Sequence, residues 1–170
     1  MALHTQMVKS TPISNDMPLI LGGREWINFP YFGRPIVEAQ VCPALGINLM
    51  SVPEVSIHDR AGEARVSFPF HQEAEGGNAG ANRVSAAILG VGEYQNAKGE
   101  RFRTYETELC VVIGCEAFLT GFSLFAEAGS SRSLIVDPYL WPLETQFDAQ
   151  LEYACGEPEH ILMDMLARRH

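Results

Sequence analysis

The sequence has no continuous hydrophobic run long enough to cross a membrane. Its purely apolar stretches last only a few residues, whereas a membrane-spanning helix needs roughly 20. The first ten residues, 1–10, also lack the basic start and the apolar centre of a secretory signal. We therefore predict a protein that stays in the cytoplasm where it is synthesised, with no membrane among its partners.

Basic residues are scarce. Twelve Lys and Arg residues stand against 21 Asp and Glu residues, which gives a formal net charge of −9. The two lysines, Lys9 and Lys98, lie far apart, and the arginines are scattered along the chain. A charge of this sign repels phosphate backbones at long range. The composition argues against a nucleic acid as a general partner.

Motifs that bind metals or nucleotides are missing. Cys110 and Cys115 are too far apart in sequence for the closely spaced cysteine pairs of structural zinc sites. Gly90-Val-Gly92 lacks the third glycine of a dinucleotide-binding loop, and no glycine-rich stretch leads into Lys-Ser or Lys-Thr. No serine stands in a Gly-x-Ser-x-Gly element. We predict neither a metal site nor a cofactor.

The four cysteines are too few for a disulfide scaffold. Without a secretory signal, reduced and buried thiols are the better interpretation of an even number of cysteines. This interpretation covers Cys42, Cys110, Cys115 and Cys155.

Alternating apolar and polar residues predict a mainly β fold. The segments 55–58 and 64–68 flank a turn that contains Gly62, and the segments 84–95 and 101–113 flank a turn that contains Gly99. In the last of these segments one face carries Tyr105, Thr107, Leu109, Val111 and Ile113, and the other carries Phe102, Thr104, Glu106 and Glu108. We expect the first face to be buried and the second to be mostly solvated.

A third pair of strands is expected over 118–128 and 133–140, which flank a turn that contains Gly129, and a further strand is expected over 143–153. The end of the chain has a helical stripe of apolar residues with acidic residues at its start and arginines at its end, which predicts a helix over 157–168. We predict one domain over 1–170. It consists of an extended arm (1–50), a β body (52–155) that forms an antiparallel sandwich or barrel, and the C-terminal helix.

The predicted arm contains four prolines and a group of aromatic residues. Proline continues neither a helix nor the interior of a sheet, and so much aromatic area is costly to leave in water. The arm must therefore pack on its own body or on a neighbouring subunit, and both options stay open. The predicted interface residues are Trp26, Phe29, Tyr31 and Phe32.

The candidates for catalysis are two histidines and two glutamates. His58 and His71 lie on neighbouring predicted strands near Asp59 and Glu73, a combination that could form a two-histidine, one-carboxylate group. Glu106 and Glu108 project from one face of a strand, about 7 Å apart, which is loosely compatible with paired carboxylates. Solvated histidines and ordinary strand polarity are the simpler interpretations of both pairs.

Three functions remain open, and we rank them by what the sequence offers. First is a structural or assembly subunit that forms oligomers with protein subunits, with a virus particle such as a phage head or tail as its setting. Second is a small β-barrel enzyme or ligand-binding protein that acts on a small molecule. Third is a non-catalytic module that presents the loop 71–82, or a free strand edge, to a protein partner.

Overall fold

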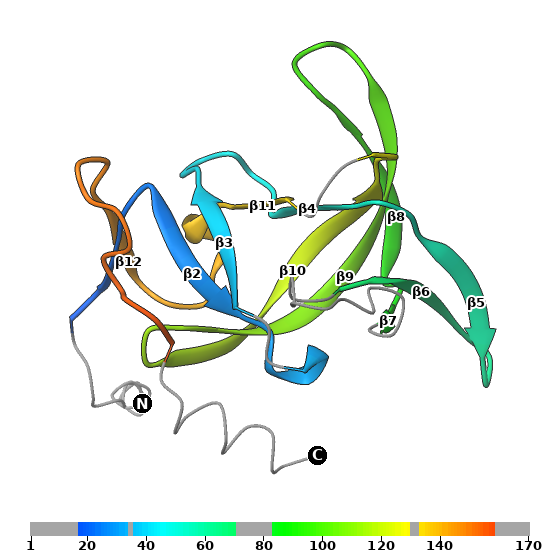
Figure 1. Cartoon of the computed structure of the whole chain (residues 1–170), viewed down its shortest axis with the longest axis horizontal. Helices are drawn as coiled ribbons and strands as arrows, with labels where there is room; N and C mark the ends of the chain where they lie inside the picture. Colours follow the sequence, from blue (N-terminus) through cyan, green and yellow to red (C-terminus); the bar gives the residue numbers. More distant parts are fainter. Residues whose placement is uncertain (1–16, 34–35, 71–82, 130–132, 159–170) are drawn as a thin grey trace, which may run out of the picture.

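The structure is a computed structural model that describes residues 17–33, 36–70, 83–129 and 133–158. Strands dominate it, with two short 3₁₀ helices between them (Figure 1). In these ranges no helix is both long enough and apolar enough to cross a membrane.

The body is a closed barrel of six strands. Their order around the barrel is β10-β4-β11-β3-β2-β9, and the pairing of β9 with β10 closes it. Most pairs are antiparallel, but β10 with β4 and β11 with β3 are parallel. The prediction of a mainly β barrel is thus confirmed. The bounds of the six strands are β2 (Arg24–Asn28), β3 (Ile36–Val41), β4 (Leu49–Val52), β9 (Arg101–Ile113), β10 (Glu116–Ala126) and β11 (Ser133–Val136).

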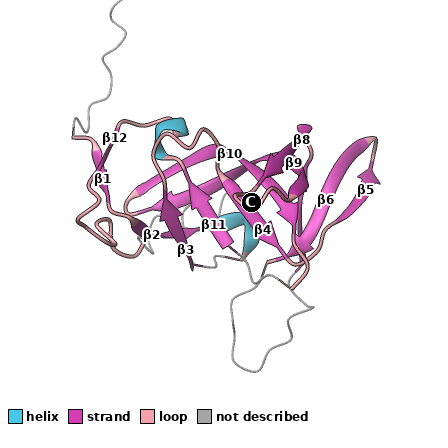
Figure 2. Cartoon of the chain, turned by 90° about the horizontal axis from the view of Figure 1, so that it is seen from above, coloured by secondary structure: helices cyan, strands magenta, loops and turns pink. Residues whose placement is uncertain are grey.

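Two smaller sheets and one further strand are added to the barrel. A three-stranded sheet in the order β5-β6-β7 projects from one end of it (Figures 1 and 2). Strand β8 (Gly90–Gln95) extends the sheet beyond β9. Strands β1 (Leu19–Leu21) and β12 (Thr145–Phe147) pair in parallel. The three-stranded sheet consists of β5 (Ser56–Arg60), β6 (Glu63–Pro69) and β7 (Arg83–Ala87).

Two of the three predicted hairpins are present. The predicted pairing of 118–128 with 133–140 is wrong, because β4 lies between β10 and β11 and pairs with both. Gly62 and Gly99 both have φ near the left-handed region, at +85° and +86°, which a glycine adopts without the steric cost of a Cβ atom. The first face of β9 is buried as expected, with Leu109, Val111 and Ile113 in the core. The second face is more covered than predicted, because Thr104 is only 1% exposed.

Residues 17–33 and 36–41 do not form the separate arm that the prolines suggest. They form β1, β2 and β3, and the last two are barrel strands. The buried residues Val37, Ala39 and Val41 alternate with exposed or half-buried ones along β3, as in a strand with one face on the core. Pro30 opens the 3₁₀ helix η1 (Pro30–Phe32) between β2 and β3, where its missing N–H is not needed.

Some of the elements predicted from the sequence lie outside the residues that the structure describes. Residues 1–16 of the predicted arm and the loop 71–82 lie outside the described residues, as does the predicted C-terminal helix from residue 159 onward. The segment 148–157, where we expect a strand until 153, has turns and bends instead.

A buried polar network fixes the loop between β3 and β4. The Asp137 carboxylate accepts hydrogen bonds from the main-chain N–H groups of Ala44, Gly46 and Tyr139, at 3.1, 2.7 and 2.9 Å. Asn48 accepts a bond from the Asp137 N–H at 2.7 Å and donates one to the Gly121 carbonyl at 2.8 Å. Because satisfied buried polar groups favour a single arrangement, this network helps to hold the parallel strand pairs in register.

The barrel interior is packed with apolar side chains. Phe29 is 1% exposed, with ring centroids 5.1 Å from Phe70 and 5.8 Å from Phe122. Valine, leucine and isoleucine side chains from all six barrel strands or their neighbours complete the core. A small-molecule site inside the barrel, as the enzyme hypothesis requires, has no support in this packing.

Candidate functional site

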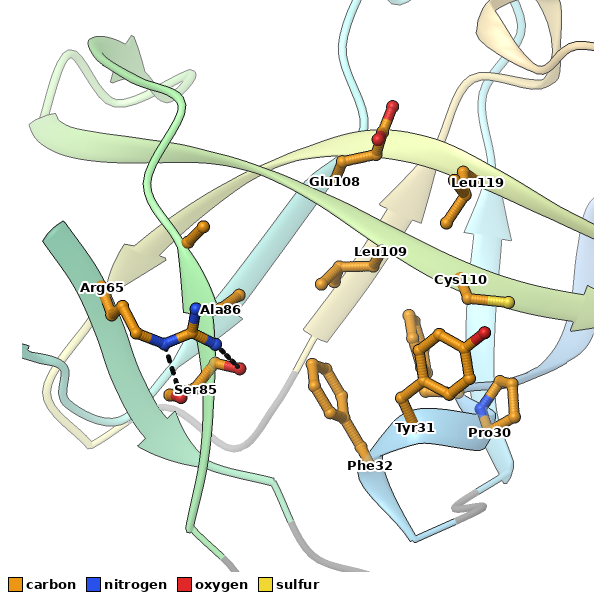
Figure 3. Close-up of a pocket in the computed structure, with 12 residues that line it drawn as sticks. Pro30, Tyr31, Phe32, Arg65, Ser85, Ala86, Glu108, Leu109, Cys110 and Leu119 are labelled. Carbon is orange, nitrogen blue, oxygen red and sulfur yellow. Dashed lines mark hydrogen bonds between the residues drawn. The ribbon is translucent and has the colours of Figure 1, made fainter. Parts of the chain in front are cut away.

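A groove of about 530 Å³ opens between helix η1, strand β7 and strand β9. Its volume lies within the range of natural binding pockets. Figure 3 shows the side chains of η1 on one side, those of β6 and β7 on the other, and β9 between them. Only one side chain of β10, Leu119, contributes to the wall.

The groove exists because the chain changes sheets between β7 and β8. The Ile88 N–H donates to the Ala64 carbonyl of the three-stranded sheet at 2.9 Å. The next N–H, that of Leu89, donates to the Glu106 carbonyl of β9 at 2.7 Å. Strand β7 therefore diverges from β9 at this point and pairs with β6 instead.

This divergence leaves part of β9 without a neighbour on one side. On that side β8 pairs with β9 only as far as Glu106, and β2 pairs with it next at Val112. In an antiparallel ladder the main-chain groups of successive residues point to opposite sides. Since the Glu106 carbonyl faces Leu89, the N–H and C=O groups of Glu108 and Cys110 point into the groove. No strand of the described ranges pairs with them there.

The opposite wall of the groove is also a strand edge. The main-chain groups of β7 also point alternately toward β6 and away from it. Because the Ile88 N–H donates to Ala64, the main-chain groups of Ser85 and Ala87 point away from β6 and toward the groove. Arg65 reaches over β7 and donates to the Ser85 carbonyl at 3.2 Å and to the Ser85 hydroxyl at 3.1 Å (Figure 3). The side chains of this wall are small.

Aromatic residues form the third wall. Phe29 and Phe32 stack with their ring centroids 6.1 Å apart, and Phe32 also contacts Phe68 at 5.8 Å. Tyr31 is 48% exposed at the mouth of the groove, next to Cys110 (Figure 3). Burial raises the pKa of the Cys110 thiol, and a hydrogen bond with Tyr31 partly offsets this rise.

The charged residues of the groove differ in how far they are already paired. Arg65 forms an ion pair with Glu63 at 2.8 Å. Glu108 is exposed, and no cation of the described ranges forms an ion pair with it. Glu106 accepts hydrogen bonds from the hydroxyls of Ser123 and Thr104, at 2.5 and 2.7 Å.

The predicted catalytic candidates do not come together in one site. His58 lies exposed on β5, and His71 is outside the described residues. Glu106 and Glu108 share a face of β9 as expected, but only Glu108 lines the groove. Among the described residues no group of three or more His, Cys, Asp or Glu side chains could hold a metal ion.

Three of the four predicted interface residues line the groove. Phe29, Tyr31 and Phe32 do so, and Tyr31 is the one with a large exposed area. Trp26 lies elsewhere and stacks on Tyr153, with ring centroids 5.0 Å apart. Phe29 and Phe32 pack on the core of their own chain.

The sequence gives one signal for the groove that the prediction misses. We expect a single strand over 84–95, whereas β7 and β8 are separate strands in different sheets. The run Ala86-Ala-Ile-Leu89 interrupts the alternation and is followed by Gly90. Such an interruption indicates a break in the strand.

A second unusual place is a buried carboxylate near the end of the described chain. Glu25 is fully buried and accepts main-chain hydrogen bonds from Gly22 at 2.7 Å, Ala154 at 2.9 Å and Cys155 at 3.1 Å. Burial, the Glu25 carboxylate and the nearby Cys115 raise the pKa of Cys155 to about 12. These contacts attach the segment 148–157 to β2, and we find no opening to a ligand among them.

Comparisons with known proteins give a fold and no activity. No family model matches the chain, and no curated protein matches it. Among solved structures it is similar to Lpg0085, a protein of unknown function (DUF785) from Legionella pneumophila subsp. pneumophila str. Philadelphia 1. The TM-score is 0.55 at 11% sequence identity, over 82% of this chain and 99% of that chain. At this identity the likeness concerns the fold alone.

Proposed function

We propose that this protein is a non-catalytic binding module that takes up an extended segment of a partner protein in the groove. The segment adds to the free edge of β9 as a further antiparallel strand. One observation supports this most strongly: the main-chain groups of Glu108 and Cys110 point into a groove of about 530 Å³ with no strand beside them in the described ranges.

Strand addition uses such an edge directly. Main-chain hydrogen bonds supply the affinity and side-chain pockets supply the specificity. The open stretch from Thr107 to Val111 would be about 16 Å long at the usual rise of a strand. Glu108 and Cys110 together offer two donors and two acceptors to an incoming segment.

The chemistry of the lining favours binding over catalysis. Cys110 is the thiol in the groove, and the thiolate is the nucleophilic form of cysteine. Burial raises the pKa of Cys110 and so disfavours that form. The histidine that is described, His58, lies on β5 and does not line the groove.

A strand-forming peptide tests the proposal. We expect a fluorescein-labelled peptide of alternating threonine and valine to slow the hydrogen exchange of the Glu108 and Cys110 amides, as measured by NMR. Ala87→Trp places a large side chain in the groove. Because this side chain blocks contacts between the peptide and the protein, it should weaken binding about tenfold or more. Val91→Trp, at an exposed position of β8 that does not line the groove, is the matched control and should bind as the parent does. Unchanged exchange at both amides at saturating peptide would contradict strand addition.

A different observation favours a second function, the assembly of copies of this chain. All five residues of β5 are exposed, and in the described ranges β5 pairs only with β6. Ile57 on this strand is 48% exposed. Exposed edges with apolar residues are templates for pairing with another chain, so β5 is suited to join two copies edge to edge. The virion setting considered from the sequence gains no support from the fold or the comparisons.

Oligomeric state tests this second function. Light scattering after size-exclusion chromatography should show a dimer or larger species that dissociates in Ile57→Lys, whereas Leu89→Lys, at an exposed position off β5, should leave it intact. A parent protein that is monomeric at every concentration would contradict assembly.

A further inference from the structure

We infer that the segment bound in the groove carries two apolar residues followed by a lysine or arginine, with the basic residue opposite Glu108. This inference rests on the proposed function and specifies the chemistry of the partner. Its basis is the set of side chains that flank the free edge of β9.

The orientation of the segment follows from the neighbouring strand. Strand β8 is antiparallel to β9 and ends its pairing at Gly90 and Glu106. A segment that continues this line runs in the direction of β8. Its residues therefore meet Cys110 first, then Leu109 and then Glu108.

The middle residue of the three faces the core. Side chains of paired strands alternate between the two faces in step, so the residue opposite Leu109 points to the side of Leu109. Figure 3 shows Leu109 pointing toward Ala86 and Phe32. Leu109 and Ala86 are buried and Phe32 is partly buried against the same core, so an apolar side chain fits this position.

The first residue of the three, opposite Cys110, lies on the other face. It has two neighbours there. One is Leu119 of β10, which pairs with Cys110 and is 53% exposed, and the other is Tyr31 at the mouth of the groove. An apolar side chain here would cover exposed area of both. Burying such apolar area stabilises a complex.

The third residue meets negative charge. Glu108 is exposed, and Glu106 lies two residues away on the same face, about 7 Å along the strand. Arg65, the cation that lines the groove, already binds Glu63 and the Ser85 carbonyl. The net charge of −9 also steers basic segments toward the protein. A lysine or arginine opposite Glu108 therefore complements a charge that has no ion pair within the described part of the chain.

Two peptides that differ in one residue test this inference. The first has the sequence Ser-Thr-Val-Leu-Lys-Thr-Ser, and the second has glutamate in place of lysine. Opposite charges across a strand pair attract and like charges repel, so we expect the lysine peptide to bind at least about fivefold more tightly than the glutamate peptide by fluorescence anisotropy. Glu108→Lys should reverse the preference. Glu93→Lys, which changes an exposed carboxylate of β8 away from the groove lining, alters the net charge equally and should preserve the preference.

Hydrogen exchange of the Glu108 and Cys110 amides separates the two possible failures. Equal affinity of both peptides, with both amides slowed, would overturn the basic residue and leave strand addition standing. If neither peptide slows the two amides at saturation, the proposed function itself is overturned. A preference for lysine that Glu93→Lys abolishes would overturn the inference as well, because it would reflect net charge rather than Glu108.

Discussion

At the scale of single residues, buried polar groups with several partners hold the ends of the described chain in place. Glu25 accepts three main-chain hydrogen bonds, two of them from residues 154 and 155 far along the sequence. Gly22 beside it has no room for a side chain, since a Cβ atom would lie 2.5 Å from the Leu151 carbonyl oxygen. These contacts explain why a segment without strands stays on the barrel.

Replacing Glu25 should therefore destabilise the protein. In Glu25→Gln one acceptor oxygen becomes an amide nitrogen, which leaves at least one of the three N–H groups without its partner and costs about 2 kcal/mol. Urea unfolding followed by circular dichroism measures this loss. Glu93→Gln, an exposed position, serves as control and should change the free energy of unfolding by less than about 0.5 kcal/mol. A Glu25→Gln variant as stable as this control would contradict the role of the carboxylate.

The Cys155 thiol makes the free energy of unfolding depend on pH in the alkaline range. Its pKa rises from 9.0 to about 12 because of burial first, then the Glu25 carboxylate and Cys115. Above the unfolded pKa the folded chain holds more protons than the unfolded chain, so stability falls as pH rises through this window. Relative to Cys155→Ala, the parent should lose at most about 1.4 kcal/mol per pH unit above about pH 9. Urea titrations at several pH values measure the difference, and a constant difference up to about pH 11 would contradict the shift.

At the scale of elements, the decisive feature is the switch of the chain from the three-stranded sheet to the barrel sheet at Ile88 and Leu89. It leaves β9 with one edge that is paired with β10 from Tyr105 to Ile113, and one edge that is open from Thr107 to Val111. Along this stretch, the N–H of every second residue of β9 faces β10, and the N–H groups of the residues between them face the groove.

Proline substitutions distinguish the two kinds of residue. Proline removes an N–H, which is tolerated where that N–H faces away from the ladder. Glu108→Pro should therefore cost about 2 kcal/mol less than Leu109→Pro, each measured against the alanine variant at the same position to remove side-chain effects. Chemical unfolding gives the four values. Equal costs at both positions would mean that the N–H of Glu108 is paired.

The elements also show where prediction from sequence succeeds and where it stops. The hairpins around Gly62 and Gly99 follow from alternation and turn residues, because both signals are local. Whether β7 pairs with β6 or with β9 depends on contacts between distant segments. For this reason we expect a single strand over 84–95, although the alternation is interrupted at 86–89. The prolines around η1 suggest an arm for a similar reason: a short turn between two barrel strands and an extended arm have the same local composition.

At the scale of the whole molecule, the chain builds a closed barrel and attaches to it one sheet that diverges from its wall. The mainly β class could be predicted because apolar alternation extends through most of the chain. The site could be predicted only in part. Phe29, Tyr31 and Phe32 are predicted as interface residues from their aromatic area, and they line the groove. The open edge of β9 is a product of topology, and its one trace in the sequence is the interrupted alternation at 86–89 before Gly90.

The open edge of β9 is the central claim, and amide hydrogen exchange of the free protein, resolved by NMR, tests it most directly. If the edge is open, protection alternates along β9: the amides of Thr107, Leu109 and Val111 exchange slowly, and those of Glu108 and Cys110 exchange at least about tenfold faster. Uniformly slow exchange across all five amides would show that another strand already occupies the groove, and both the proposed function and the inferred partner would be wrong.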